Sequence, residues 1–317
     1  MTKPPSHLPL EIAPVNRINL LSALDCVRGC LKTTSMLWMH ALGLRVLPGV
    51  VLSDWSKSSE NAVRRFARTG HFSQVLLRID KRNERWTRRR GGYLISLADA
   101  PATVRELQRE GMIAVLLEPA SPYADNYGLA GVTVPEEEKL IVEVVGPGFD
   151  ASDILRNDLT PHERWEVDLG PLNRRANAVL GTSCRRIHLI SSEDYMATVE
   201  TRLAKIGARA KNPAFPDAVL KGSKADSSML AEEGIAFLKR THQTLLLKHA
   251  GSYSAIPEKH IVSFAHNIQV LLSGLSGYGI HLGPSSFAAS IVPKRGLVFW
   301  DFFPARKQEA ASLYPAA

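Results

Sequence analysis

The chain has 317 residues, of which 45% are hydrophobic and 22% charged, a balance that indicates a globular protein with a substantial core. Its formal net charge of +8 permits a polyanionic partner, and ATP, nucleic acid or an acidic surface would all qualify. The basic residues are spread out, except for one dense cluster between Lys81 and Arg90, which is either a solvated loop or a phosphate-binding loop.

Cysteine usage and the apolar segments exclude several classes of protein. The three cysteines, Cys26, Cys30 and Cys184, are an odd number and include no second pair with zinc-ligand spacing. The first sixteen residues lack the basic start and apolar run of a secretory signal, and no window is long enough for a transmembrane helix. We therefore expect a cytoplasmic protein with no membrane partner.

Hydrophobic periodicity and turn residues predict alternating helices and strands after a proline-rich arm at residues 1–16. Helical spacing continues from Arg17 to Leu42, with a turn expected at residues 32–35 and an end at Gly43. Further helices are predicted at Ser58–Thr69 (capped by Ser58 or Ser59 and closed by Gly70), Pro101–Glu110, Ser192–Ile206, Glu232–Lys248 and His260–Ser273. Strands or extended segments are predicted at residues 44–52, 74–79, 93–96, 113–117, 140–145 and 161–167. Residues 168–232 are polar and irregular, and a loop is expected at 207–228.

The last predicted element is a β-hairpin, Ser286–Val292 and Leu297–Phe302, joined by a turn at residues 293–296. Asp301 interrupts the apolar second strand, so its carboxylate needs a partner. Simple alternation places two sets of side chains on opposite faces: Leu297, Phe299 and Asp301 on one, and Val298, Trp300 and Phe302 on the other.

Two buried strands lead into polar segments where a ligand could bind. The first, Ile113–Leu117, ends at Glu118, and the second, Leu140–Val145, ends at Gly146-Pro147-Gly148. Glycines there would let the backbone approach a ligand closely, although from this stretch alone an ordinary turn between core strands is the better explanation. Within the second strand, alternation places Glu143 opposite its apolar neighbours.

Several segments, taken in order, resemble the nucleotide-binding domain of phosphoenolpyruvate synthase and pyruvate phosphate dikinase. Residues 32–52 are similar to the opening helix, glycine and apolar-proline-glycine strand of that family. Later segments are similar to its phosphate-contacting strand, its small-residue loop, its hinge strand, its glycine-rich turn and its final hairpin: Val75–Arg78, Gly91–Tyr93, Val115–Glu118, Val142–Pro161 and Leu297–Asp301.

The resemblance implies an α/β (α+β) chain with the ATP-grasp fold, in which two lobes enclose a nucleotide cleft. It covers most of residues 30–165 and the last thirty or so. The implied organisation is a flexible arm at 1–16, an N-terminal lobe at 17–112 and a C-terminal lobe at 113–317, with a helical insertion at about 168–284.

The resemblance also implies a site for Mg²⁺ and ATP. Lys32 and Arg78 would bind phosphates and serve catalysis, and Gly91 and Gly92 would bring backbone amides close to phosphate oxygens. The alternatives are a solvated lysine, an ion pair of Arg78 with Asp80, and a plain hairpin turn.

Three carboxylates complete the implied site. Glu118 would accept from the adenine amino group or the ribose hydroxyls, Glu143 would contact ribose or a cation, and Asp301 would bind Mg²⁺. Salt bridges or exposure explain Glu118 and Glu143 equally well. His162 could be a general base or an interface histidine.

The final hairpin departs from the family pattern. Ala289 or Ser290 stands where the family has an acid, and Phe303 stands where it has an arginine. We therefore expect an ATP-dependent enzyme that transfers a phosphoryl group to an unidentified small molecule. The alternatives are a carboxylate–amine ligase that acts through an acyl phosphate, and a nucleotide-binding or partner-binding protein that has lost catalysis. Nucleic-acid binding ranks last.

Overall fold

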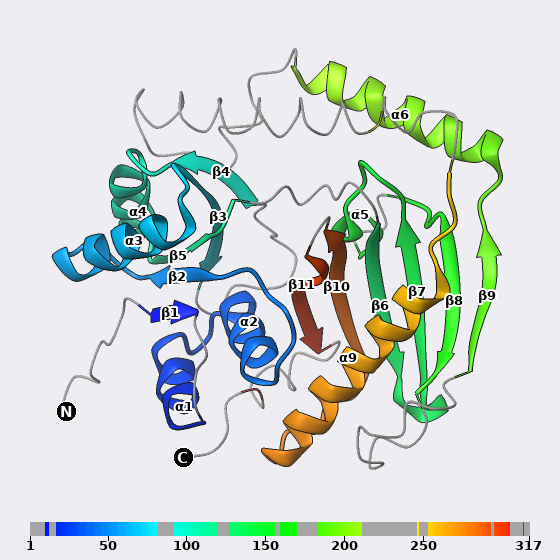
Figure 1. Ribbon diagram of the computed structural model, residues 1–317, viewed down its shortest axis with the longest axis horizontal. Helices are drawn as coiled ribbons and strands as arrows, with labels where there is room; N and C mark the ends of the chain where they lie inside the picture. Colours follow the sequence, from blue (N-terminus) through cyan, green and yellow to red (C-terminus); the bar gives the residue numbers. More distant parts are fainter. Residues whose placement is uncertain are drawn as a thin grey trace. The chain divides into compact units, whose positions relative to one another are not determined.

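The computed structural model describes residues 10–12, 17–81, 92–119, 127–155, 159–169, 183–210, 246, 253–292, 295–304 and 313. These residues form a mixed α/β structure, as expected, and their strands make two antiparallel sheets (Figure 1). The chain divides into two compact units. The first comprises Met1–Leu37, Leu47–Ser121 and Gly207–Arg240, and the second comprises Trp38–Val46, Pro122–Ile206 and Thr241–Ala317.

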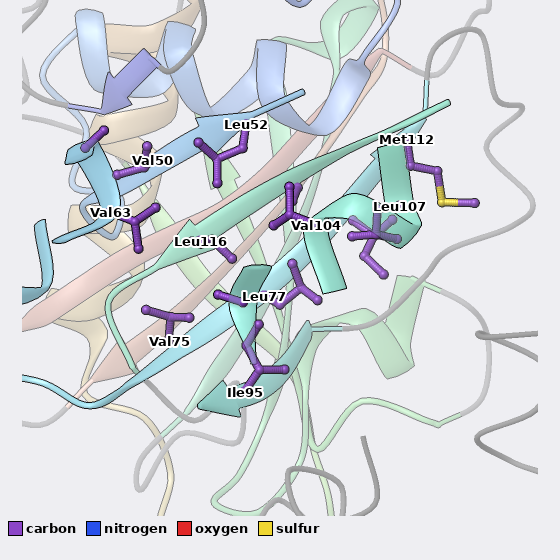
Figure 2. Close-up of a cluster of buried hydrophobic side chains, with 14 residues drawn as sticks. Val50, Leu52, Val63, Val75, Leu77, Ile95, Val104, Leu107, Met112 and Leu116 are labelled. Atoms are coloured by element: carbon purple, nitrogen blue, oxygen red, sulfur yellow. The ribbon is translucent and has the colours of Figure 1, made fainter. Parts of the chain in front are cut away.

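The first unit is built on a five-stranded sheet in the order β1-β2-β5-β3-β4. Its strands are β1 (Leu10–Ile12), β2 (Gly49–Leu52), β3 (Gln74–Lys81), β4 (Gly92–Ser96) and β5 (Met112–Leu117). The helices α3 (Lys57–Gly70) and α4 (Ala100–Arg109) supply Val63 and Val104 to a buried cluster on one face (Figure 2). Leu77 and Ile79 of β3 belong to that cluster, so alternation turns Arg78 and Asp80 to the opposite face.

The helix α3 begins one residue earlier and ends one residue later than predicted. The hydroxyl of Ser56, rather than that of Ser58 or Ser59, accepts from the Ser59 N–H at 3.3 Å. At the other end the helix includes Gly70, and His71 adopts the left-handed conformation with φ 53°. A serine two residues earlier is an equally good cap, so the sequence did not distinguish the three serines.

The turn expected at residues 32–35 is wrong, because these residues are helical. The first helix, α1 (Arg17–Cys26), ends before Gly29, which has φ 85°, and α2 spans Leu31–Ala41. The backbone N–H groups in the first turn of a helix have no partner within the helix, so a helix can begin here only if another group accepts from them. Asp80 of β3 accepts from both the backbone N–H and the hydroxyl of Thr33, at 2.8 and 2.9 Å, so a distant strand caps this helix.

The second unit is built on a six-stranded sheet in the order β11-β10-β6-β7-β8-β9. Its strands are β6 (Gly128–Val134), β7 (Lys139–Val145), β8 (Glu163–Asp168), β9 (Cys184–Leu189), β10 (Ser285–Val292) and β11 (Gly296–Pro304). A 3-10 turn, η1 (Pro135–Glu137), joins β6 to β7. The helix α6 (Ser192–Ala210) follows β9.

Two helices pack on opposite faces of this sheet. The helix α9 (Glu258–Gly277) lies across one face, where a Cβ added to Gly131 would come within 2.7 Å of the Phe264 ring (Figure 1). The short helix α5 (Ala151–Leu155) lies against the other face, where a Cβ added to Gly128 would meet the Ala151 nitrogen at 2.9 Å. Glycine in β6 therefore admits a helix on each side.

Most predicted elements in the described residues are confirmed, and three strands were omitted. The strands β6 and β9 and the short β1 were not predicted. The helix α6 continues to Ala210, into the expected loop at 207–228. The rest of that loop and almost all of the predicted helix Glu232–Lys248 lie outside the described residues. In the described part of the chain, no helix is both long and apolar enough to span a membrane.

The contact of Gly131 with Phe264 predicts a costly substitution. Gly131→Ala would force a methyl group into the ring, and it should lower the free energy of unfolding by about 1–3 kcal/mol. Gly277→Ala in α9 is the matched control, because nothing lies within 4 Å of its added Cβ. Urea denaturation of both variants checks the prediction, and equal stability would show that β6 and α9 separate without cost.

Candidate functional site

The structure brings the two predicted phosphate-binding cations together in the first unit. Lys32 lies in the first turn of α2, and its Nζ donates to the Ile79 carbonyl of β3 at 3.3 Å. One turn later on α2, the Met36 sulfur lies 3.4 Å from Nη1 of Arg78. Positions four apart share one side of a helix, so Lys32 and Arg78 both take part in the contact between α2 and β3.

Asp80 is the buried carboxylate beside these cations. Besides Thr33, it accepts from the Lys81 N–H at 2.9 Å. Burial raises the pKa of Asp80, and its hydrogen bonds with Thr33 and the nearby charge of Lys32 oppose that rise. Asp80 is therefore committed to holding α2 against the sheet, which positions Lys32.

The other residues predicted for the first unit are only partly described. Gly92 begins β4 and pairs with Arg78 of β3. Glu118 directly follows β5, and its N–H donates to the Pro48 carbonyl at 2.9 Å. Gly91 and the basic cluster at residues 82–90 lie outside the described residues.

A β-bulge in β11 decides which way Asp301 points. Ala289 pairs with Phe299 and Ala288 pairs with Asp301, so Trp300 is the extra residue. The predicted alternation is therefore wrong: Phe299 lies on the α9 face, where its ring stacks on Phe264 at 5.5 Å, whereas Asp301 lies on the opposite face. Sequence alternation fails here because one strand carries one residue more than its partner.

Asp301 and Glu143 occupy the same row of the same face. The cross-strand pairs run from Asp301 to Ala288, from Ala288 to Ala130, from Ala130 to Glu143 and from Glu143 to Arg164. We call these five residues the Glu143–Asp301 row. Directly paired residues share a face, so two carboxylates flank a stretch of alanines on the side of the sheet that carries α5.

The spacing within the row separates the roles of the two acids. Asp301 and Glu143 are three strands apart, or about 14 Å at the usual spacing of strands, so they cannot share one cation. Among the residues that the structure describes, no three His, Cys, Asp or Glu side chains gather as a metal site.

Glu143 is paired with its neighbour on the row. Nε of Arg164 donates to Oε1 of Glu143 at 2.9 Å, and Nη2 of Arg164 makes a second contact with the same oxygen. The Arg164 side chain is 47% exposed, and ion pairs of this kind contribute only about 0–1 kcal/mol. A ligand hydroxyl can therefore compete with Arg164 for Glu143.

The glycines after β7 serve packing inside the second unit. A Cβ on Gly146 would meet the Tyr253 ring at 2.8 Å, and one on Gly148 would meet the Leu246 side chain at 2.9 Å. The Gly146 N–H donates to Nδ1 of the buried His162 at 2.9 Å. Of the two explanations that the sequence left open, the turn between core strands fits these contacts.

The sequence did not single out Glu163, a hydrogen-bonded carboxylate of β8 in the second unit. Its two oxygens accept from the Tyr253 hydroxyl at 2.7 Å, the Ile256 N–H at 2.6 Å and the Trp165 indole at 3.1 Å, and Nε of Arg186 lies 3.0 Å away. The side chain is fully buried. A glutamate on the apolar side of a strand, in line with Trp165, was the available signal.

Burial of His162 predicts an acid-sensitive fold. Desolvation lowers the pKa of His162 to about 3, whereas an unfolded histidine titrates near 6.5. Between these values the unfolded chain binds more protons, so stability should fall as pH decreases from about 6.5, by up to about 4–5 kcal/mol. Thermal melts at pH 7 and pH 4.5 should differ more for the wild type than for His162→Phe, and an equal difference would contradict the prediction.

Comparison with known proteins gives a slight likeness to a group of ligases. No family model matches the chain, and no curated protein matches it. Among solved structures, D-alanyl-alanine synthetase A from Vibrio cholerae is 11% identical with a TM-score of 0.37, over 93% of this chain and 60% of the other. D-cycloserine synthetase DcsG is 9% identical with a TM-score of 0.39, over 92% and 70%. VanG D-Ala:D-Ser ligase from Enterococcus faecalis is 10% identical with a TM-score of 0.33, over 93% and 57%. The chain thus spans about 60% of the length of the first of these proteins.

Proposed function

We propose that the chain is an ATP-dependent enzyme of the ATP-grasp class, which binds Mg-ATP and transfers its terminal phosphoryl group to a small acceptor. The observation that carries the proposal is the Glu143–Asp301 row, where two acids flank small side chains on one face of a sheet. ATP needs cations for its phosphates and carboxylates for its metal and ribose. The chain offers Lys32 and Arg78 for the phosphates, and Asp301 and Glu143 for the metal and the ribose.

Each residue has one role in this proposal. Lys32 and Arg78 neutralise phosphate oxygens, and Arg78 can grip two oxygens with its planar fork. Asp301 binds Mg²⁺, and Glu143 accepts from the ribose hydroxyls in place of Arg164. Gly91 and Gly92 bring backbone N–H groups to the phosphates, and Glu118 accepts from the adenine amino group.

Two acceptor chemistries share this first step. Transfer to a hydroxyl or phosphate would make the protein a kinase, whereas transfer to a carboxylate gives an acyl phosphate that an amine can capture, as in a ligase. In both reactions the acceptor oxygen forms a new bond to the γ-phosphorus, and the bond between that phosphorus and ADP breaks. A ligase also releases inorganic phosphate when the amine attacks. Products measured with candidate acceptors therefore separate the two activities.

Loss of catalysis is the second candidate, and one observation favours it. Ser290 lies on the Asp301 face, at the position that would carry a further acid, and its hydroxyl accepts from the Trp300 indole at 2.8 Å. Ala289 lies on the α9 face. Asp301 therefore has no second hairpin carboxylate beside it, and the row could bind a nucleotide without turning it over.

Asp301→Asn tests the metal role. It keeps the shape of the side chain and removes its charge, so magnesium-dependent ATP affinity should fall about 10- to 100-fold, which corresponds to the loss of a charged contact. Glu166→Gln is the matched control, because Glu166 lies on the same face and pairs with Lys139 at 3.1 Å. Calorimetry with and without Mg²⁺ measures both variants. If Asp301→Asn binds Mg-ATP as the wild type does but melts earlier, Asp301 is structural.

Arg78→Ala tests the phosphate role in the first unit. Its affinity for ATP should fall about 10- to 100-fold, while its affinity for adenosine should stay unchanged because adenosine carries no phosphate. Arg64→Ala is the control, since the Arg64 side chain on α3 is exposed and forms an ion pair with Glu60 of the same helix. Equal losses for ATP and adenosine in Arg78→Ala would indicate a damaged fold instead.

A further inference from the structure

One side chain holds the turn between β7 and α5. Nδ1 of His162 accepts the Gly146 N–H at 2.9 Å, which commits its acceptor nitrogen. The rings of Phe149, Tyr195 and Tyr253 pack edge-on around the imidazole, with centroids at 4.8, 4.9 and 5.2 Å. His162 is fully buried, so its ring has no room to turn to another partner.

The same turn determines where α5 lies on the sheet. Within it, the Phe149 N–H donates to the Gly146 carbonyl at 3.2 Å, and α5 begins two residues later at Ala151. The backbone of Ala151 packs against Gly128 of β6. Gly128 is two residues from Ala130 on the same face, so α5 borders the Glu143–Asp301 row.

Loss of the His162 acceptor would leave the Gly146 N–H buried without a partner. Such a group costs far more than its hydrogen bond contributes, and the turn can relieve that cost by moving toward water. Movement of the turn would carry the start of α5 and the end of β7 with it. Glu143 lies three residues before Gly146 on β7 and would shift too.

We propose that His162 is a positioning residue, which accepts the Gly146 N–H and thereby fixes α5 and the end of β7 beside the Glu143–Asp301 row. The effect on nucleotide affinity rests on the proposed function of that row. The restraint on the turn does not, because it follows from the contacts of Gly146, Phe149 and Gly128 alone.

The aromatic packing supplies a matched pair of variants. His162→Phe keeps a ring between the three aromatic side chains and removes the Nδ1 acceptor, together with Nε2, which has no hydrogen-bond partner among the described residues. Tyr195→Phe is the control: its hydroxyl is buried without a hydrogen-bond partner in the described part of the chain, so its loss leaves the Gly146 bond untouched. His162→Gln offers a side-chain oxygen in place of Nδ1 and serves as the rescue variant.

Amide hydrogen exchange and calorimetry with Mg-ATP test the proposal together. In His162→Phe, amides of residues 146–155 should exchange at least about tenfold faster, whereas those of β10 should keep their wild-type rates. The affinity for Mg-ATP should fall about tenfold. Tyr195→Phe should match the wild type in both measurements, and His162→Gln should recover part of each loss.

Each contrary result would overturn a different part of the proposal. Wild-type exchange of residues 146–155 in His162→Phe would overturn the restraint. Faster exchange with unchanged affinity would show that His162 holds the turn but does not position the row. If the wild-type protein fails to bind Mg-ATP, the proposed function and the nucleotide effect both fall, while exchange still decides the restraint. Should His162→Phe not fold, His162→Leu, which also lacks the acceptor, is compared with Tyr195→Phe in its place.

Discussion

One extra residue in β11 controls the chemistry available to the second unit. Had Trp300 not formed a bulge, Asp301 would share the face of Phe299 and lie under α9 among apolar rings. A carboxylate there would be desolvated with little to bind it. With the bulge, Asp301 joins Glu143 on the face that carries α5. The register of β10 and β11 is therefore the constraint on which the proposed nucleotide site depends.

Local pattern predicted most of the fold, and its omissions have physical causes. The strand β6 reads Gly-Leu-Ala-Gly-Val-Thr-Val, so small residues dilute the strand signal that its two neighbours in the sheet enforce. The strand β9 is exposed along almost its whole length because it pairs only with β8 among the described strands, so it shows no apolar alternation. Both segments are strands because they pair with neighbouring strands, and the sequence of the segment alone does not show that pairing.

The candidate site was predictable to the same degree. Alternation within β7 correctly placed Glu143 opposite Val142 and Val144, because β7 has no bulge. The side of Asp301 required the register of a partner strand, and the proximity of Lys32 and Arg78 required the cap that Asp80 gives to α2. Thr33 and Asp80 are 47 positions apart, and neither segment alone shows a pattern that predicts their contact.

The bonds of Glu163 have a consequence for how this protein can vary among its relatives. Glu163 joins β8 to the segment before α9 through Tyr253 and Ile256, and Arg186 of β9 balances its charge. Removal of Arg186 alone would leave a buried negative charge, while replacement of both by apolar side chains could leave the sheet intact. We therefore expect positions 163 and 186 to co-vary among relatives of this chain. Glu163 and Arg186 should be kept together or replaced together, and a sequence with only one of them should be rare.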